Sequence, residues 1–444
     1  MSRTVTTPGR APVRVHPLRA EALRGFAPWS GLVVLVTVAG LLAAGADRWQ
    51  GGWAETRAEL HGVLLVVLPL AAAAGCRQGG RERRRRTEEL WGTAARGPLA
   101  RFLASALPVA GWTTAGYVTA AAGALLATWP YARGDGPGPE LLPADAVAVA
   151  AAAVAGQVVG RLVPRRPAAP LLAVGGYVAL GLAPRADAGA GRRLNPALPV
   201  PESLVPVVWQ PVAAAVWAAG LAAAAVLAYA ARRRYTALLP LAAATAAGAL
   251  LVQGGAGLWH TDPVGDRQVC DTSTTPQICV NARYGDLLPQ VRAALSGVTS
   301  RLEGVRNLPV RFEDRPGAPR PEEAELPVLT PMGRSFVRGG LTDPEQYAWE
   351  AVAALQDRGG CEGPSDPRVI RADDAVENLL APKPAQEHFD ALDAHGDEAA
   401  RAGLRERRAA RARLASMAAD ERRAWLTEYF ATAGDCDPDE VPAL

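Results

Sequence analysis

The chain has 444 residues, 49% of them hydrophobic, and a net charge of only +3 at pH 7. This length allows two or three domains, and the nearly balanced charge gives no reason to expect nucleic acid as a partner. The balance hides an asymmetry. Residues 1–259 contain 25 Arg and 12 Asp or Glu (net +13), whereas residues 260–444 contain 22 Lys or Arg and 32 Asp or Glu (net −10). We therefore expect a basic membrane half followed by an acidic soluble half.

Seven apolar stretches in the first half are candidates for membrane-spanning helices, which need about 20 residues each. They cover residues 27–46, 60–76, 102–129, 143–163, 168–183, 207–231 and 236–259. None has a charged residue in its middle. Asp145, near the outer edge of the fourth stretch, is interpreted as an interfacial residue rather than a proton relay. Because the spans otherwise offer only neutral polar groups such as Gln157 and Gln253, a proton- or sodium-driven carrier is disfavoured.

The distribution of arginines predicts the orientation, because positively charged loops stay cytoplasmic. With the N-terminus inside, 19 arginines lie in inner segments and 6 in outer loops. Residues 1–26 are then a cytoplasmic amphipathic segment, residues 27–259 a transmembrane domain and residues 260–444 an extracytoplasmic domain. The first span could instead be a cleaved signal peptide. That alternative is disfavoured because about 25 residues precede the span and six more spans follow.

The five cysteines fit this orientation. Cys76 ends the second span on the inner side, and the other four lie in the acidic half. An even number of cysteines in an extracytoplasmic domain is typical of disulfides. Four allow three pairings, of which we favour Cys270 with Cys279 and Cys361 with Cys436. The alternative is four reduced cysteines in a cytoplasmic domain.

The acidic half is predicted to be a small α+β or mostly helical domain. Apolar residues at helical spacing predict a helix over 287–302, and LPVRF (308–312) is typical of a short strand. Asp343-Pro344 is an N-cap followed by a first-turn proline, so a helix should run from there to about Arg358. A long polar helix is expected over 385–415, and a last helix begins at Asp420. The stretch 313–340 is rich in Pro, Gly and Glu and is expected to be loop.

Motifs of catalysis are absent from the sequence. It contains no G-x-x-x-x-G-K-[ST], H-E-x-x-H or G-x-S-x-G pattern, so we expect neither an enzyme nor a bound cofactor. Ser335 has a hydroxyl without an obvious base nearby. A metal site is also disfavoured, although His388 and His395 would share a helix face, with Asp390 and Asp393 nearby.

An arginine-rich segment, GGRERRRRTEELWGTAARG (79–97), separates the second and third spans. Its oppositely charged i,i+4 pairs favour a helix, each contributing about 0.2–0.5 kcal/mol, and the helix would end in an apolar tip. A positive anchor explains the arginines but not the paired glutamates or the tip. We therefore predict that the segment docks a soluble partner through Arg81, Glu82, Arg85, Arg86, Glu88, Glu89, Leu90 and Trp91.

Residues 79–112 resemble the first cytoplasmic loop and third span of actinobacterial ABC-2-type permease-like membrane proteins. The resemblance implies that the arginine-rich segment is a coupling helix pressed against a separate ATPase subunit, and that residues 16–29 form an amphipathic helix before the first span. Residues 277–295 and 421–436 resemble an uncharacterised C-terminal domain of some of these proteins. A seventh span and a sizeable outer domain depart from the plain permease pattern.

These observations predict a non-catalytic, permease-like membrane subunit of an ABC-type transport system. It would sit in the lipid bilayer of the plasma membrane and work as a dimer with a separate ATPase. The alternative is a membrane-anchored interaction or sensor protein whose outer domain binds a ligand or partner without transport. A membrane-tethered hydrolase is disfavoured by the missing motifs.

Overall fold

The chain divides into two compact units. The computed structural model describes residues 22–23, 25–84, 97–132, 136–182, 189–315, 319–320, 322–331, 335–358, 361, 366–435 and 439–444. The first unit comprises Met1–Ala44, Arg57–Ala124 and Gly138–His260, and the second comprises Gly45–Thr56, Leu125–Pro137 and Thr261–Leu444. The second unit thus contains not only the acidic half but also two segments that connect helices of the first.

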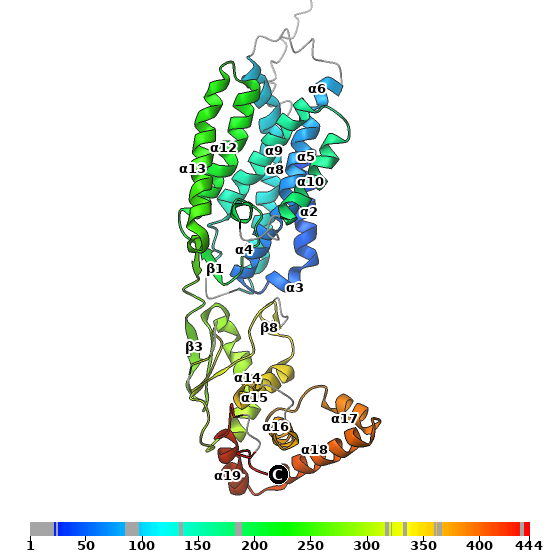
Figure 1. Cartoon of the computed structure of the whole chain (residues 1–444), viewed down its shortest axis with the longest axis vertical. Helices are drawn as coiled ribbons and strands as arrows, with labels where there is room; N and C mark the ends of the chain where they lie inside the picture. Colours follow the sequence, from blue (N-terminus) through cyan, green and yellow to red (C-terminus); the bar gives the residue numbers. More distant parts are fainter. Residues whose placement is uncertain are drawn as a thin grey trace, which may run out of the picture. The chain divides into compact units, whose positions relative to one another are not determined.

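The first unit is a helical bundle, drawn in blue to green in Figure 1. Every predicted apolar stretch is helical. The long helices are α2 (Ala27–Ala44), α4 (Trp53–Gly62), α5 (Leu64–Gly79), α8 (Pro98–Thr128), α9 (Leu142–Leu162), α10 (Ala168–Leu182), α12 (Gln210–Ala230) and α13 (Leu238–Gly254). Short elements join them: α6 (Arg81–Arg84), α11 (Ala190–Arg193), η1 (Arg234–Ala237), η2 (Gly255–Leu258), β1 (Leu204–Pro206) and β2 (Trp259–Thr261). Helix α3 (Ala46–Trp49), which follows α2, belongs to the second unit.

Five helical stretches in the described part of the chain are long and apolar enough to cross a membrane: Ala27–Ala44, Trp53–Gly79, Leu142–Leu162, Gln210–Ala230 and Arg234–Leu258. Helix α10 has only 15 residues and buries none of them fully, although it packs on α5, where Gly176 faces Pro69. The second span begins at Trp53, seven residues before the predicted start at position 60. This extension draws several polar residues into the helix.

Small residues set the closest packing in the bundle, between α5 and α9. Gly75 and Gly79 on α5 face Gly156 and Gly160 on α9, and a Cβ at any of the four would overlap backbone of the other helix. Both helices thus carry a glycine pair at i,i+4, the arrangement that lets helix backbones approach closely in membranes. The tight crossing holds the N-terminal part of α9 next to α4.

The second unit contains a four-stranded mixed sheet in the order β3-β4-β5-β6. Its strands are β3 (Gln268–Asp271), β4 (Gln277–Asn281), β5 (Arg311–Glu313) and β6 (Glu323–Glu325); the β3–β4 pair is antiparallel and the other two pairs are parallel. A small hairpin follows, β7 (Phe336–Val337) with β8 (Gly340–Leu341). The prediction of a structureless 313–340 was therefore wrong, since β6 and β7 lie within it.

The helices of the second unit are η3 (Ala282–Leu287), α14 (Leu288–Arg301), α15 (Pro344–Gln356), α16 (Pro367–Leu380), α17 (Gln386–Ala394), α18 (Glu398–Ser416) and α19 (Ala419–Phe430). Asp343 caps α15 as predicted, accepting a hydrogen bond from the Gln346 backbone N–H at 2.9 Å. The single helix predicted over 385–415 is two helices, because the chain turns at Gly396 and a new N-cap, Asp397, starts α18.

Large apolar side chains from both layers form the core of the second unit. The sheet contributes Ile278 and Phe312, α14 contributes Leu295, and α19 contributes Tyr429; all are at most 1% exposed. The disulfide between Cys270 and Cys279 joins facing residues of β3 and β4, as predicted. Cys361 is also disulfide-bonded, and its predicted partner Cys436 lies outside the described residues.

Candidate functional site

A carboxylate is buried inside the helical bundle. Asp145, in the first turn of α9, is 3% exposed. Its Oδ1 lies 3.0 Å from Nδ1 of His61 at the end of α4, and its Oδ2 accepts a hydrogen bond of 3.1 Å from the hydroxyl of Tyr117 on α8. The Tyr117 hydroxyl also lies 3.2 Å from the carbonyl oxygen of Leu60. Three helices therefore meet at one carboxylate.

This burial is possible because the charge is compensated. An isolated carboxylate in an apolar interior is strongly unfavourable, whereas hydrogen bonds to both oxygens offset much of that desolvation. Asp145 also lies at the positive N-terminal end of α9, where the helix dipole favours an anion. Ionisable groups inside a membrane-spanning bundle are rare and are usually found at functional sites.

The interpretation of Asp145 as an interfacial residue concerns its depth in a bilayer and stays a prediction, whereas the burial of its side chain was not predicted. Its position near the end of an apolar stretch suggested exposure to headgroups, but helices α4 and α8 cover it. His61 was missed because it stood at the start of a predicted span, without a neighbour in the sequence to pair with. Gln157 is buried as well, and its Nε2 donates to Ser105 Oγ on α8 at 2.6 Å.

A cavity of about 350 Å³ adjoins this pair. His61 and Asp145 lie in its wall, together with residues of α9, α11, α12, η2 and the segment between α11 and β1. The other lining residues are Leu141, Ala144, Ala148, Arg192, Arg193, Leu194, Asn195, Pro196, Leu198, Pro199, Val200, Pro201, Leu204, Gln210, Pro211, Ala214, Trp217, Leu251, Gly255, Ala256, Leu258 and Trp259. A mostly apolar wall with a few polar groups is typical of small-molecule sites.

The electrostatics of the cavity favour an anion. Two helices begin at its wall, α9 at Leu142 and α12 at Gln210, and each presents the positive end of its dipole. Asp145 compensates the first of these ends, whereas the first turn of α12 holds no acidic residue. Arg192 and Arg193 add two positive charges in α11.

The predicted docking segment lies largely outside the described residues. Arg81 to Arg84 form the short helix α6, the side chain of Glu82 is not described, and residues 85–96 fall outside. The docking role of Arg81, Glu82, Arg85, Arg86, Glu88, Glu89, Leu90 and Trp91 stays a prediction.

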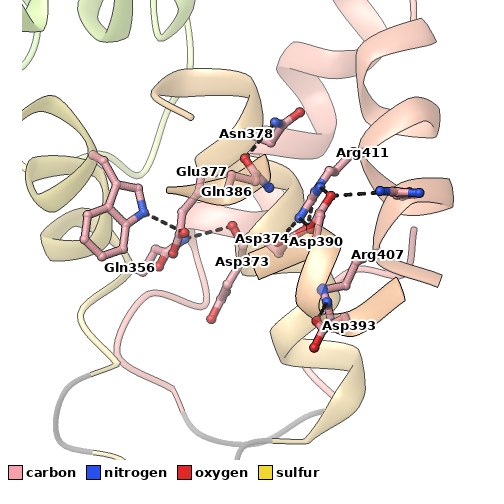
Figure 2. Close-up of polar contacts among 12 residues, drawn as sticks. Gln356, Asp373, Asp374, Glu377, Asn378, Gln386, Asp390, Asp393, Arg407 and Arg411 are labelled. Carbon is pink, nitrogen blue, oxygen red and sulfur yellow. Dashed lines mark hydrogen bonds and ion pairs between the residues drawn. The ribbon is translucent and has the colours of Figure 1, made fainter. Parts of the chain in front are cut away.

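A second polar cluster lies in the second unit, where Arg411 of α18 joins α16 and α17 (Figure 2). Its guanidinium donates two hydrogen bonds of 2.6 Å to Asp374 and two, of 2.8 and 3.3 Å, to Asp390. Asp393 pairs with Arg407 at 2.5 Å. Asp390 and Asp393 are thus engaged by arginines, and the described residues contain no group of three side chains that could hold a metal ion. We interpret this network as the polar link between three helices.

Ser335 has a structural role as well. Its Oγ accepts a hydrogen bond of 2.8 Å from the Thr330 N–H and lies 3.0 Å from the carbonyl oxygens of Val328 and Thr330, so it closes a turn. No base lies within these contacts.

Comparison with known proteins adds no further information about this site. No protein-family model, no curated protein and no solved structure matches the chain. The resemblance to ABC-2-type permeases therefore rests on the quoted sequence segments alone.

Proposed function

We propose that the chain is the permease-like membrane subunit of an ABC-type transport system. In this proposal the cavity beside Asp145 holds the transported ligand, and a separate ATPase subunit supplies the energy. The observation that carries the proposal is the 350 Å³ cavity inside a helical bundle, with the buried Asp145–His61 pair in its wall. Such a cavity between membrane helices is where transporters bind their substrates.

Seven spans with the C-terminal domain outside are part of this proposal. The two connecting segments Gly45–Thr56 and Leu125–Pro137 belong to the same compact unit as Thr261–Leu444. Segments that fold into one unit must lie on the same side of the membrane. The two connecting segments are outer loops in this topology. Residue 261 lies on the same side as they do only if an odd number of spans precedes it, and the count is odd only if α10 crosses the membrane. The composition of the second unit therefore supports a crossing by α10.

The 15 residues of α10 extend about 22 Å, less than the roughly 30 Å of a hydrocarbon core. Local thinning of the bilayer or adaptation of flanking residues can accommodate such a mismatch at modest cost. The flanking arginines Arg165 and Arg166 on one side are long enough to reach the headgroup region.

The ATPase partner would dock on residues 79–97. Leu90→Asp combined with Trp91→Ala removes the predicted apolar tip, so it should abolish co-purification with the cognate ATPase while membrane insertion is retained. A matched control is Leu392→Asp with Phe389→Ala, which alters an exposed leucine and an exposed aromatic residue on α17, outside the candidate spans. If the Leu90/Trp91 variant retains the ATPase, the coupling role is refuted and only the anchor role is left.

A membrane-anchored sensor is the second candidate, and the composition of the second unit favours it. Within that unit the Tyr284 hydroxyl donates to Glu55, and Arg338 Nε donates to Gln50 Oε1 at 2.8 Å. These contacts tie residues that precede or begin α4 to the acidic domain, so ligand binding there could move α4. An ATPase gene next to this gene favours transport, whereas a neighbouring kinase or sigma-factor gene favours the sensor.

A further inference from the structure

We propose that the cavity beside Asp145 binds an amphipathic anion: a molecule with one anionic head group, a neighbouring N–H or O–H donor, and an apolar remainder. This inference rests on the proposed function, because it names the class of ligand that the same cavity takes. The inference is based on the polar groups of the cavity wall, some of which already have hydrogen-bond or ion-pair partners in the protein whereas others have none.

The anionic head is inferred from Arg192. Of the ionisable side chains in the wall, His61 and Asp145 pair with each other, and Arg193 donates to the carbonyl oxygen of Val252 near the end of α13. The Arg192 side chain has no hydrogen-bond or ion-pair partner among the described residues. A free guanidinium that lines the same cavity as the uncompensated N-terminus of α12 can recognise a carboxylate or a phosphate.

The donor is inferred from Gln210. Its Oε1 is buried and has no hydrogen-bond partner within the described part of the chain. The other amide in the wall is satisfied, because Asn195 Nδ2 donates to the Leu180 carbonyl and its Oδ1 accepts from the Ala197 N–H, both at 3.0 Å. A buried acceptor without a partner is unfavourable, because it has lost its hydrogen bonds to water and gained none in the protein. A ligand hydroxyl or amide would restore such a hydrogen bond.

The apolar remainder is inferred from the rest of the wall. Four prolines line the cavity, at positions 196, 199, 201 and 211, and proline has no backbone N–H to offer. Trp217 and Trp259 add broad apolar surfaces. The volume of about 350 Å³ lies at the lower end of the range for sites that hold drug-sized molecules.

Such an anion could come from the bilayer or from water, and the experiment separates these sources. The full chain, reconstituted in lipid nanodiscs, receives one of three probes that carry a photoreactive diazirine in the alkyl chain. The first is a medium-chain carboxylate added from water, the second is the alcohol of the same chain, and the third is phosphatidylglycerol incorporated in the bilayer. Cross-linked peptides are identified by mass spectrometry.

At least one anionic probe should label peptides of α9 and α12 that line the cavity about tenfold more than the alcohol does, because only the anion forms a charge-assisted hydrogen bond with the guanidinium. Arg192→Gln should reduce this labelling about tenfold, and Arg192→Lys should restore part of it. Arg234→Gln, at an exposed arginine outside the cavity, should leave it unchanged. Labelling by the carboxylate indicates a soluble ligand, and labelling by phosphatidylglycerol indicates a lipid.

Equal labelling by the carboxylate and the alcohol with no phosphatidylglycerol signal, or labelling that Arg192→Gln leaves unchanged, would overturn the inference. Because Arg192 is exposed and its side chain has no hydrogen-bond or ion-pair partner among the described residues, its substitution should not impair folding, and size-exclusion profiles check this. Co-purification of the ATPase does not involve Arg192. The permease proposal therefore stands even if Arg192→Gln leaves the labelling unchanged. The anion inference likewise stands even if the Leu90/Trp91 variant retains the ATPase.

Discussion

The two units of the chain are both largely helical, but different side chains hold them together. In the first, α5 and α9 cross at four glycines, with backbone against backbone. In the second, β5, α14 and α19 pack large side chains such as Phe312 and Tyr429 into one core. The difference reflects the two solvents. In lipid, moving an apolar side chain into the protein gives little hydrophobic free energy, so close van der Waals contact must hold membrane helices together. In water, the hydrophobic effect drives large apolar side chains into a core.

The largest effect is expected from truncation in the second core. Phe312→Ala removes a ring on β5 that is 0% exposed in the core of the second unit, which should cost about 3–5 kcal/mol of unfolding free energy. Hydrogen-exchange mass spectrometry of the full chain should then show faster exchange in peptides of the second unit, with those of α5 and α9 unaffected. Equal loss of protection in both units would contradict their separate construction.

A substitution that adds a side chain instead of removing one tests the crossing of α5 and α9. Gly156→Ala places a methyl group where it overlaps the backbone of Ala72, so we expect a loss of about 1–3 kcal/mol, measured as a lower thermal unfolding midpoint in detergent. Gly123→Ala on α8 is the matched control, because no atom lies within 4 Å of the added methyl. If both variants unfold at the same temperature, the glycines do not set the packing of this bundle.

A smaller effect, on pH dependence, is expected from Asp314. Burial raises the pKa of its carboxyl from 3.8 to about 7. The folded state therefore binds a proton that the unfolded state has released. The resulting stabilisation is full below about pH 4, is lost as the pH rises through about 7, and changes by at most about 1.4 kcal/mol per pH unit.

Asp314→Asn should flatten this part of the stability profile of the second unit, measured by denaturant unfolding between pH 5 and 8 at roughly one-unit steps. Asp266→Asn, at an exposed carboxyl in the same unit, should leave the profile unchanged. A profile that keeps its slope in Asp314→Asn would show that another group is responsible.

Much of the fold follows from local patterns. Hydropathy alone predicted helices at all seven apolar stretches, because a membrane helix needs little more than length and apolar composition. Helical spacing predicted α14, and the Asp343-Pro344 pair predicted the start of α15. The errors have local causes too. Gly396 ends a polar pattern that otherwise continues. Helix α16 was missed although Asp366 and Pro367 give it the same N-cap and first-turn proline as Asp343 and Pro344 give α15.

The candidate site could not be predicted in the same way. His61 and Asp145 are 84 residues apart, and their pairing depends on the α5–α9 crossing and on an earlier start of the second span. Each residue alone resembled an ordinary residue at the end of a span. The unsatisfied Gln210 and the free Arg192 become informative only once the cavity and its other contacts are known.

The most direct test of the central claim is the side of the membrane on which residues 260–444 lie, because both the transport and the sensor proposals place them outside. Intact cells are treated with a membrane-impermeant thiol reagent before and after mild reduction. The account predicts labelling of Cys270, Cys279, Cys361 and Cys436 only after reduction, and no labelling of the buried Cys76. Labelling of those four cysteines only after lysis would contradict it.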